Sequence, residues 1–453
     1  MLPEPGPSSP PTPPPAQLIW PLPRRRPGLA DLRVFTSDAP AGGRHRPTPR
    51  SLRVPPVRPP GGRHRLGTTG TAVVLAALLA VGCSNGAASV GQGGQPVTGA
   101  AQPDARLSLR GQCPDTVVVQ SSWFPQVEHS AVYQLLGAGY RLDAGHKSVT
   151  GPLVSSGVDT GVKLQIRAGG PVVAYQPVSA RMDADRSITL GMVPSDELIQ
   201  QSAAHPLLGI VAPLDLDPQI IAWDPATHPN WNTISDIGQT NETVLYFPGL
   251  PYMDYLLGAG ILRRSQVDSS YDGNPSRFIA SRGRIAVQAY LTNEPYAWAH
   301  EVAAWGRPMA YQLVTDTGYP NYSNVLAIRP GDRDRLDGCL RRLVPMIQGA
   351  QVQFMARPDP TIDVIVSTAK AYHGFTYTTA LAKYAVRVMR SEGIVGNAGN
   401  PTLGDFDHAR VARLLQILKP IFAGQNKNIR PGLGFDDVVT NAYIAPTIGL
   451  PAR

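Results

Sequence analysis

The stretch from Cys113 to His129 reads CPDTVVVQSSWFPQVEH. Within it, Thr116–Gln120 (TVVVQ) is a short, mostly apolar run of the kind that forms a strand buried on both faces of a sheet. A turn at Pro125 follows this run, and a helix is expected from Ala131 to Leu136. The stretch therefore predicts the first strand–helix unit of an α/β fold.

Beyond this unit, short apolar runs continue to alternate with helical stretches. Strands are expected at Val162–Ile166, Ser187–Val193, Leu207–Ala212, Thr243–Phe247, Ile285–Tyr290, Ala310–Val314 and Val325–Ile328. Helices are expected after Gly169-Gly170-Pro171, from Ser195, and over Gly249–Leu257, Glu294–Trp305, Leu336–Met355, Ile362–Val366, Tyr372–Arg390 and Phe406–Phe422. This alternation predicts the α/β class with a largely parallel sheet.

The chain is expected to cross from one α/β lobe to a second and back. Lobe 1 would comprise residues 113–212 and 308–445, and lobe 2 residues 213–307. Ligands of such sheets bind beyond the carboxyl ends of the strands, and the space between two lobes is a preferred site. A hinge between the lobes would let them close on a ligand.

The net charge of +8 is confined to the first part of the chain. Residues 1–82 contain 11 Arg, no Lys and three acidic residues, whereas the rest holds 30 basic and 30 acidic residues. A neutral body lacks the basic footprint of nucleic-acid binding, so no such partner is expected. Residues 1–62 hold 18 of the 46 prolines and are either a disordered extension or the product of a start site placed too far upstream.

A secretory leader is expected at residues 63–82. It has a basic start and a ten-residue apolar run, Ala72–Val81, which is half of the about 20 residues that a membrane-spanning helix needs. Cys83 follows as in a lipobox, although Ala80 stands where that pattern prefers Leu. The alternative is an ordinary signal peptide with an incidental cysteine. Residues 83–112 have the composition of a flexible tether, which favours a lipid anchor on the outer face of a bacterial membrane.

Two more cysteines, Cys113 and Cys339, lie in the body of the chain. Export implies an oxidising compartment, and both residues lie at element boundaries, so a disulfide between them is expected. Two unpaired buried thiols are the alternative. The sequence has no CxxC motif and no Cys/His cluster, so neither a metal site nor a cofactor is expected.

The order of several motifs carries a resemblance to a known family. The motifs are Ser122-Trp123-Phe124-Pro125-Gln126-Val127-Glu128-His129, Gly169-Gly170-Pro171, Met192-Val193-Pro194-Ser195-Asp196-Glu197, Ser235-Asp236-Ile237-Gly238-Gln239-Thr240, Tyr290-Leu291-Thr292-Asn293-Glu294-Pro295 and Thr440-Asn441-Ala442-Tyr443-Ile444. Over residues 113–445 the chain resembles the nitrate/sulfonate/taurine branch of ABC-importer solute-binding proteins, which includes binders of thiamine pyrimidine precursors. The resemblance implies a two-lobed periplasmic-binding-protein-like fold that delivers a small ligand to a permease and its ATPase.

Candidate ligand-binding residues follow the carboxyl ends of the expected strands. They are Trp123, Phe124, His129, Gly169, Gly170, Tyr246, Tyr252, Asn293 and Glu294. Aromatic rings can stack on a planar ligand, glycines let backbone N–H groups approach it, and a carboxylate can accept from an amino group. The structural alternatives are interlobe packing for the aromatic residues, a helix cap for Glu128 and His129, a tight turn for the glycines and a salt bridge for the glutamate.

The sequence contains no hydrolase, nucleotide-binding or metalloprotease motif. It therefore favours a monomeric binding protein, not an enzyme, with an exported enzyme or a ligand sensor on the same scaffold as alternatives. Aromatic residues on both lobes suggest a planar heterocyclic ligand. Small anions need concentrated Arg or Lys contacts, and Arg167 is alone near the glycine turn.

Overall fold

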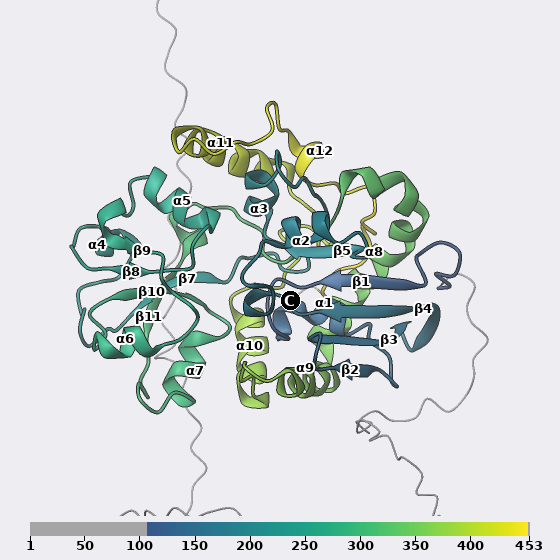
Figure 1. Ribbon diagram of the computed structural model, residues 1–453, viewed down its shortest axis with the longest axis horizontal. Helices are drawn as coiled ribbons and strands as arrows, with labels where there is room; N and C mark the ends of the chain where they lie inside the picture. The colour runs from purple at the N-terminus through teal and green to yellow at the C-terminus, as the bar shows by residue number, and fades with distance from the viewer. Residues whose placement is uncertain (1–106, 452–453) are drawn as a thin grey trace, which may run out of the picture. The chain divides into compact units, whose positions relative to one another are not determined.

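Two mixed β-sheets organise residues 107–451, the part of the chain that the computed structural model describes (Figure 1). The first sheet has the order β2-β3-β4-β1-β5-β12-β6 and consists of β1 (Thr116–Gln120), β2 (Arg141–Asp143), β3 (Ser148–Ser155), β4 (Val158–Arg167), β5 (Leu190–Val193), β6 (Leu208–Val211) and β12 (Val325–Ile328). The second has the order β11-β7-β10-β8-β9 and consists of β7 (Gln219–Trp223), β8 (Val244–Leu245), β9 (Val267–Asp268), β10 (Ala286–Tyr290) and β11 (Ala310–Leu313). We call each sheet with its helices a lobe. The predicted α/β class and two-lobed arrangement are confirmed.

Helices and 3-10 turns fill the connections between the strands. Lobe 1 begins with η2 (Val127–His129), α1 (Ser130–Tyr133), η3 (Gly170–Val173), α2 (Val178–Ala184) and α3 (Ser195–Gln200). Lobe 2 contains α4 (Ile234–Gly238), α5 (Pro251–Gly258), η4 (Arg264–Gln266), α6 (Ser276–Ala280) and α7 (Glu294–His300). After lobe 2 come η5 (Val314–Thr317), η6 (Pro330–Asp332), α8 (Arg333–Ala356), α9 (Asp359–Tyr372), α10 (Thr379–Ser391), α11 (His408–Gly424) and α12 (Phe435–Val438).

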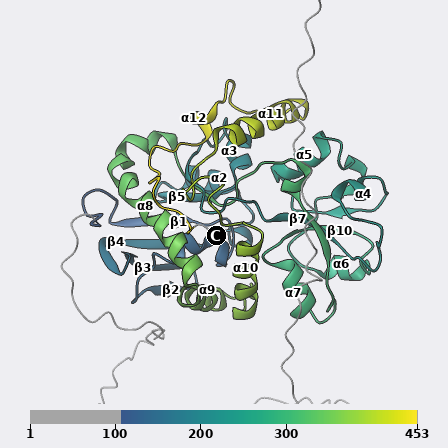
Figure 2. The ribbon, with the colours of Figure 1, turned by 180° about the vertical axis from the view of Figure 1, so that it is seen from behind.

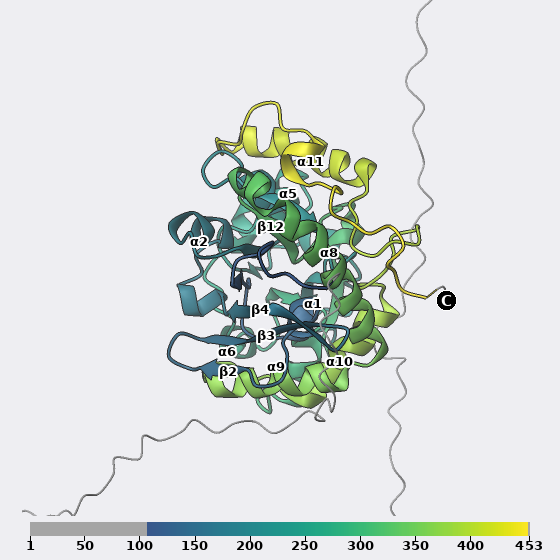
Figure 3. The same cartoon turned by 90° about the vertical axis from the view of Figure 1, so that its right-hand side faces the viewer.

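Helices cover both faces of the first sheet. Figures 2 and 3 show α8 on one face and α2 on the other, and α8 contacts β6 while α2 contacts β5. All residues of β5, β6 and β12 are accordingly buried. This double coverage explains why these strands read as continuous apolar runs without alternation.

The pairing of the strands differs from the prediction of a largely parallel sheet, which is wrong. Four strand pairs are parallel (β1–β4, β1–β5, β8–β10 and β8–β9), and six are antiparallel. One source of antiparallel pairs is β12, which follows the return of the chain from lobe 2 and runs antiparallel to both β5 and β6. Another is the β3–β4 hairpin, whose turn residues Ser156 and Gly157 have φ of 50° and 81°. Positive φ at both turn positions is typical of a tight hairpin turn.

The chain crosses between the lobes twice, through residues 212–218 and through residues 314–324. Strand β11 precedes the second crossing and pairs with β7. It therefore belongs to the sheet of lobe 2, which corrects its expected place in lobe 1 from residue 308 onward. The run Ala310–Leu313 is apolar enough for either sheet, so composition could not locate the crossing.

The two lobes share one hydrophobic core cluster. It includes Ile199 of α3, Leu256 of α5 and Leu414 of α11. Helix α11 packs against α3 of lobe 1 and α5 of lobe 2. Motion of one lobe relative to the other must therefore accommodate this shared helix.

A disulfide joins Cys113, just before β1, to Cys339 in α8. None of the helices within residues 107–451 is long and apolar enough to span a membrane. The expected extension 1–62, the leader 63–82, Cys83 and most of the tether 83–112 lie outside the described residues.

Candidate functional site between the lobes

Four aromatic side chains, two from each lobe, meet where β1 and β8 end. Trp123 and Tyr175 come from lobe 1, and Phe247 and Tyr271 from lobe 2; we call them the aromatic cluster. Phe247 lies in its centre, with ring centroids 5.5 Å from Trp123, 5.5 Å from Tyr175 and 4.8 Å from Tyr271. The Tyr175 hydroxyl also donates to the Asp272 carbonyl of lobe 2 at 3.0 Å. The lobes are thus in contact at the edge where ligands of such sheets bind.

The predicted glycine turn contacts this cluster at Trp123. A Cβ on Gly169 would lie 2.2 Å from the Ser121 carbonyl oxygen, and one on Gly170 would lie 2.4 Å from Cε3 of Trp123. Gly170 also has a positive φ of 64°. Both glycines are therefore required by the close approach of the loop that carries Trp123, which is the structural alternative considered for this turn.

Glu128 and His129 are buried beside the cluster, with 1% and 0% of their surfaces exposed. The Thr292 hydroxyl of lobe 2 donates to Oε1 of Glu128, while Oε2 of Glu128 and Nδ1 of His129 have no hydrogen-bond partner among residues 107–451. Burial raises the pKa of Glu128 and lowers the pKa of His129 to about 3. Neither side chain caps a helix. Glu128 therefore links the lobes with one oxygen and leaves the other free.

Glu294 begins α7 on the same loop as Thr292. Its Oε2 accepts from the Tyr290 backbone N–H at 2.7 Å, which ties the loop to the end of β10. Burial raises the pKa of Glu294 to about 7, and the nearby Glu128 adds to the rise. Asn293 occupies the N-cap position of α7, but its side chain makes no capping bond. The Glu294 carboxylate forms no salt bridge within residues 107–451.

A pair of buried carboxyl groups lies at the crossings. Asn321 of the second crossing donates to Oδ2 of Asp217 in the first crossing at 2.7 Å, and accepts from the Asp196 backbone N–H at 3.0 Å. The Tyr319 hydroxyl donates to Oδ2 of Asp196 at 2.8 Å. Burial, together with the charge of Asp217, raises the pKa of Asp196 to about 8. Sequence reasoning missed both acids, because nothing in their local sequence distinguishes them from surface aspartates.

Arg410 of α11 ties the two crossings together. Its guanidinium pairs with Asp215 of the first crossing at 2.9 Å and donates to the carbonyl oxygens of Pro320 and Asn321 in the second. It also lies 3.6 Å from the ring centroid of Tyr322, a cation–π distance. The Arg410 guanidinium is therefore already engaged by several groups of the two crossings.

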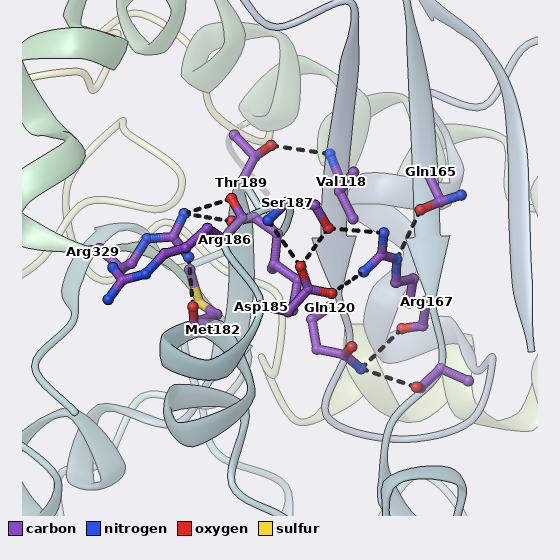
Figure 4. Close-up of polar contacts among 12 residues, drawn as sticks. Val118, Gln120, Gln165, Arg167, Met182, Asp185, Arg186, Ser187, Thr189 and Arg329 are labelled. Atoms are coloured by element: carbon purple, nitrogen blue, oxygen red, sulfur yellow. Dashed lines mark hydrogen bonds and ion pairs between the residues drawn. The ribbon is translucent and has the colours of Figure 1, made fainter. Parts of the chain in front are cut away.

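Arg167, the basic residue nearest the glycine turn in sequence, is also committed elsewhere (Figure 4). It pairs with Asp185 at 2.8 Å and donates to Gln165 and Ser187. Arg329 in the same view donates to the carbonyl oxygens of Met182 and Ile188. Both guanidinium groups therefore hold the structure of lobe 1 together.

Three predicted site residues are not members of the aromatic cluster. Phe124 stacks on Phe375 at 5.2 Å in a small core cluster of lobe 1, against which Trp123 also packs. Tyr252 is buried in the shared core and donates to Oε1 of Gln288 at 2.7 Å. Tyr246 packs against that core. Phe247, adjacent to Tyr246, is the aromatic residue that reaches Trp123. Phe247 follows the end of a β-strand as Trp123 does, so the same sequence signal could have found it.

A surface hollow of about 360 Å³ lies in lobe 1, lined by residues that include His205, Asp183 and Arg329. It adjoins the start of β6 and the end of β12, so it lies at the edge of the sheet opposite the aromatic cluster. Within residues 107–451, no group of three or more His, Cys, Asp or Glu side chains is placed to hold a metal ion.

The fold is similar to that of several solved structures. The periplasmic aliphatic sulphonate binding protein SsuA from Escherichia coli is 11% identical, with 71% of this chain and 94% of that chain covered and a TM-score of 0.46. The alkanesulfonate-binding protein SsuA from Xanthomonas axonopodis pv. citri, bound to MOPS, is 12% identical, with 72% and 98% covered and a TM-score of 0.46. The desulfurization enzyme DSZB is 13% identical, with 73% and 97% covered and a TM-score of 0.40.

Both binding proteins and an enzyme occur among these structures. At such identities and TM-scores we infer neither ligand nor activity from them. No protein-family model and no curated protein matches the chain.

Proposed function

We propose that this chain is the extracytoplasmic solute-binding component of an ABC importer. It would capture a small ligand between its lobes and deliver it to a permease and its ATPase. The observation that carries the proposal is the meeting of side chains from both lobes at the carboxyl ends of their strands, namely Trp123 with Phe247 and Glu128 with Thr292. Side chains divided between two lobes can surround a ligand only when the lobes close on it.

The two crossings support capture by closure. Two connecting segments allow a rotation of one lobe while restricting sliding. The second crossing contacts the loop that carries Trp123, since the Ser122 hydroxyl donates to Oδ1 of Asn324 at 3.1 Å, and it is bonded to the first crossing through Asn321 and Asp217. The planar ligand suggested by the sequence would lie against the aromatic cluster, which offers Trp123 and Tyr175 on one lobe and Phe247 and Tyr271 on the other. In this proposal the protein binds and releases its ligand without converting it chemically.

Native mass spectrometry of protein purified without denaturation tests this function. We expect a co-purified small molecule that raises the melting temperature when it is added back to the stripped protein, and that is recovered unchanged. Chemical conversion of that molecule by the purified protein would instead favour an exported enzyme on the same scaffold.

The proposed lipid anchor on Cys83 would keep this receptor near its permease. Replacing the thiol in Cys83→Ser removes the group that is acylated, so we expect the variant to appear in the culture medium. Fractionation of cells and medium measures this, with the wild type, which keeps Cys83 and the Cys113–Cys339 disulfide, as the control. A Cys83→Ser variant that stays in the membrane fraction would contradict the anchor but not the capture of solute.

A further inference from the structure

Several buried polar atoms near the aromatic cluster and the crossings have no hydrogen-bond partner within the described residues. They are Oε2 of Glu128, Nδ1 of His129, Oδ1 of Asp196 and the hydroxyl of Tyr271. All four side chains are at most 4% exposed. Buried polar groups are normally paired, so these atoms indicate a bound group that pairs with them. Two of the four are carboxyl oxygens, which accept hydrogen bonds when ionised.

The same region is rich in carboxyl groups that no cation neutralises. Glu128, Asp196, Asp217 and Glu294 form no ion pair among residues 107–451, and their hydrogen-bond donors there are neutral hydroxyl, amide and backbone groups. We call these four residues the junction carboxyls. The charge of Arg410 acts on the pKa of Asp217 and lowers it, but the Arg410 guanidinium is already paired with Asp215.

The aromatic cluster adds a second attraction of the same sign. The faces of Trp and Tyr rings carry negative charge density, so they attract a cation that approaches them. Tyr271 connects the two features, because its ring contacts Phe247 and its unpaired hydroxyl lies within the electrostatic influence of Glu294. Carboxylates and ring faces together favour a positively charged group attached to a planar or apolar frame.

We propose that the ligand of the interlobe site is an organic cation whose N–H groups donate to Glu128 and whose planar frame lies against the aromatic cluster. The inference rests on the proposed function. A sulfonate or carboxylate ligand would face the junction carboxyls, and the guanidinium groups of Arg167 and Arg410 are both engaged elsewhere. Burial raises the pKa of Glu128 in the unliganded protein, and a bound cation would lower that pKa and stabilise the ionised carboxylate, which a neutral ligand would not do.

Isothermal titration calorimetry with three probes of one size tests the charge of the ligand. The probes are benzamidinium, benzamide and benzenesulfonate, titrated at pH 8 into protein stripped of any co-purified molecule. We expect benzamidinium to bind at least tenfold more tightly than benzamide, and benzenesulfonate not to bind. Equal responses to all three probes, including no response to any, or a preference for benzenesulfonate, would overturn the inference.

The variant Glu128→Gln keeps the shape of the side chain and removes its charge. It should weaken benzamidinium binding about tenfold to a hundredfold, the range for loss of a charge-assisted hydrogen bond, and leave benzamide binding unchanged. The matched control is Glu242→Gln, on the loop before β8 at the opposite edge of the second sheet. Unchanged benzamidinium affinity in Glu128→Gln would contradict the assigned role.

Native mass spectrometry separates failure of this inference from failure of the proposed function. An anionic co-purified molecule would overturn the cation assignment while leaving solute capture intact. If there is neither a co-purified molecule nor binding of any probe, both the cation assignment and the proposed solute-binding function are contradicted.

Discussion

The contact between Gly170 and Trp123 shows how one residue positions the candidate site. A Cβ at Gly170 would overlap the Trp123 ring, so Gly170→Ala must displace the ring or strain the turn. We expect it to lower the free energy of unfolding by about 1–3 kcal/mol more than Gly139→Ala does. Gly139 has a similar positive φ of 80° but nothing within 4 Å of its Cβ position, so it carries the backbone cost alone. Urea denaturation measures both, and equal losses would contradict the packing role.

Asp196 gives the protein a pH dependence whose sign can be worked out. Burial raises its pKa to about 8, so the folded state holds a proton that the unfolded state loses near pH 4. Stability therefore falls as pH rises toward 8. The opposite contribution of His129, whose pKa is lowered to about 3, accrues mostly below pH 6.5, the ordinary pKa of histidine. Glu294, with a pKa of about 7, acts in the same direction as Asp196.

We accordingly expect the melting temperature of the wild type to fall between pH 6.5 and pH 8. In Asp196→Asn the fall should be smaller, because the amide cannot ionise beside Asp217, Glu197 and Tyr319. Asp272→Asn, an exposed site, is the control. Identical slopes in the variant and the wild type would show that Asp196 does not set this dependence.

At the residue scale, the sequence directed attention to some residues of the candidate site and not to others. Trp123 and Glu294 follow predicted strands, so strand position alone directed attention to them. Asp196 and Asp217 become neighbours only because two crossings and the start of α3 converge on Asn321. Such convergence depends on tertiary structure, and no local pattern encodes it.

At the element scale, α11 is coupled to the hinge through Arg410. Arg410→Met would leave the Asp215 carboxylate and three backbone carbonyls of the crossings without their partner, so we expect a loss of about 2–3 kcal/mol in the free energy of unfolding. Arg413→Met is the matched control, since Arg413 lies on the same helix, is exposed, and contacts Gln416. Chemical denaturation of both variants provides the measurement. Equal small losses in the two variants would contradict a stabilising role of Arg410 at the crossings.

The accuracy of the strand predictions depended on how each strand is buried. Strands β1 and β12 were predicted with their correct bounds, because both are apolar runs between polar flanks. Strand β3 (SVTGPLVS) was missed, since five of its eight residues are polar, Gly or Pro, so it is not an apolar run. Strand β7 was missed as well, although all five of its residues are buried.

At the scale of the whole molecule, the disulfide closes a loop with a sequence separation of 226 residues. Such a cross-link restricts the unfolded chain, and native disulfides typically contribute about 2–4 kcal/mol. We expect reductant to lower the denaturation midpoint of the wild type by a corresponding amount. The double variant Cys113→Ser/Cys339→Ser should already have the lower midpoint and should not respond to reductant. A response in the double variant would indicate that reductant acts elsewhere.

Two α/β lobes joined by two crossings followed from the sequence, whereas the shared core did not. Helix α11 and the cluster around Ile199, Leu256 and Leu414 connect the lobes on one side, so closure must pivot about that side. The aromatic cluster and Glu128 lie where the two lobes touch, and their contacts must separate before a ligand can enter.

Small-angle X-ray scattering tests capture between the lobes most directly. The protein would be stripped of its co-purified molecule, measured, and measured again after that molecule is added back. Capture by closure predicts a larger radius of gyration in the stripped protein and a return to the smaller value on reloading. An unchanged radius of gyration, with binding verified in the same sample, would contradict it.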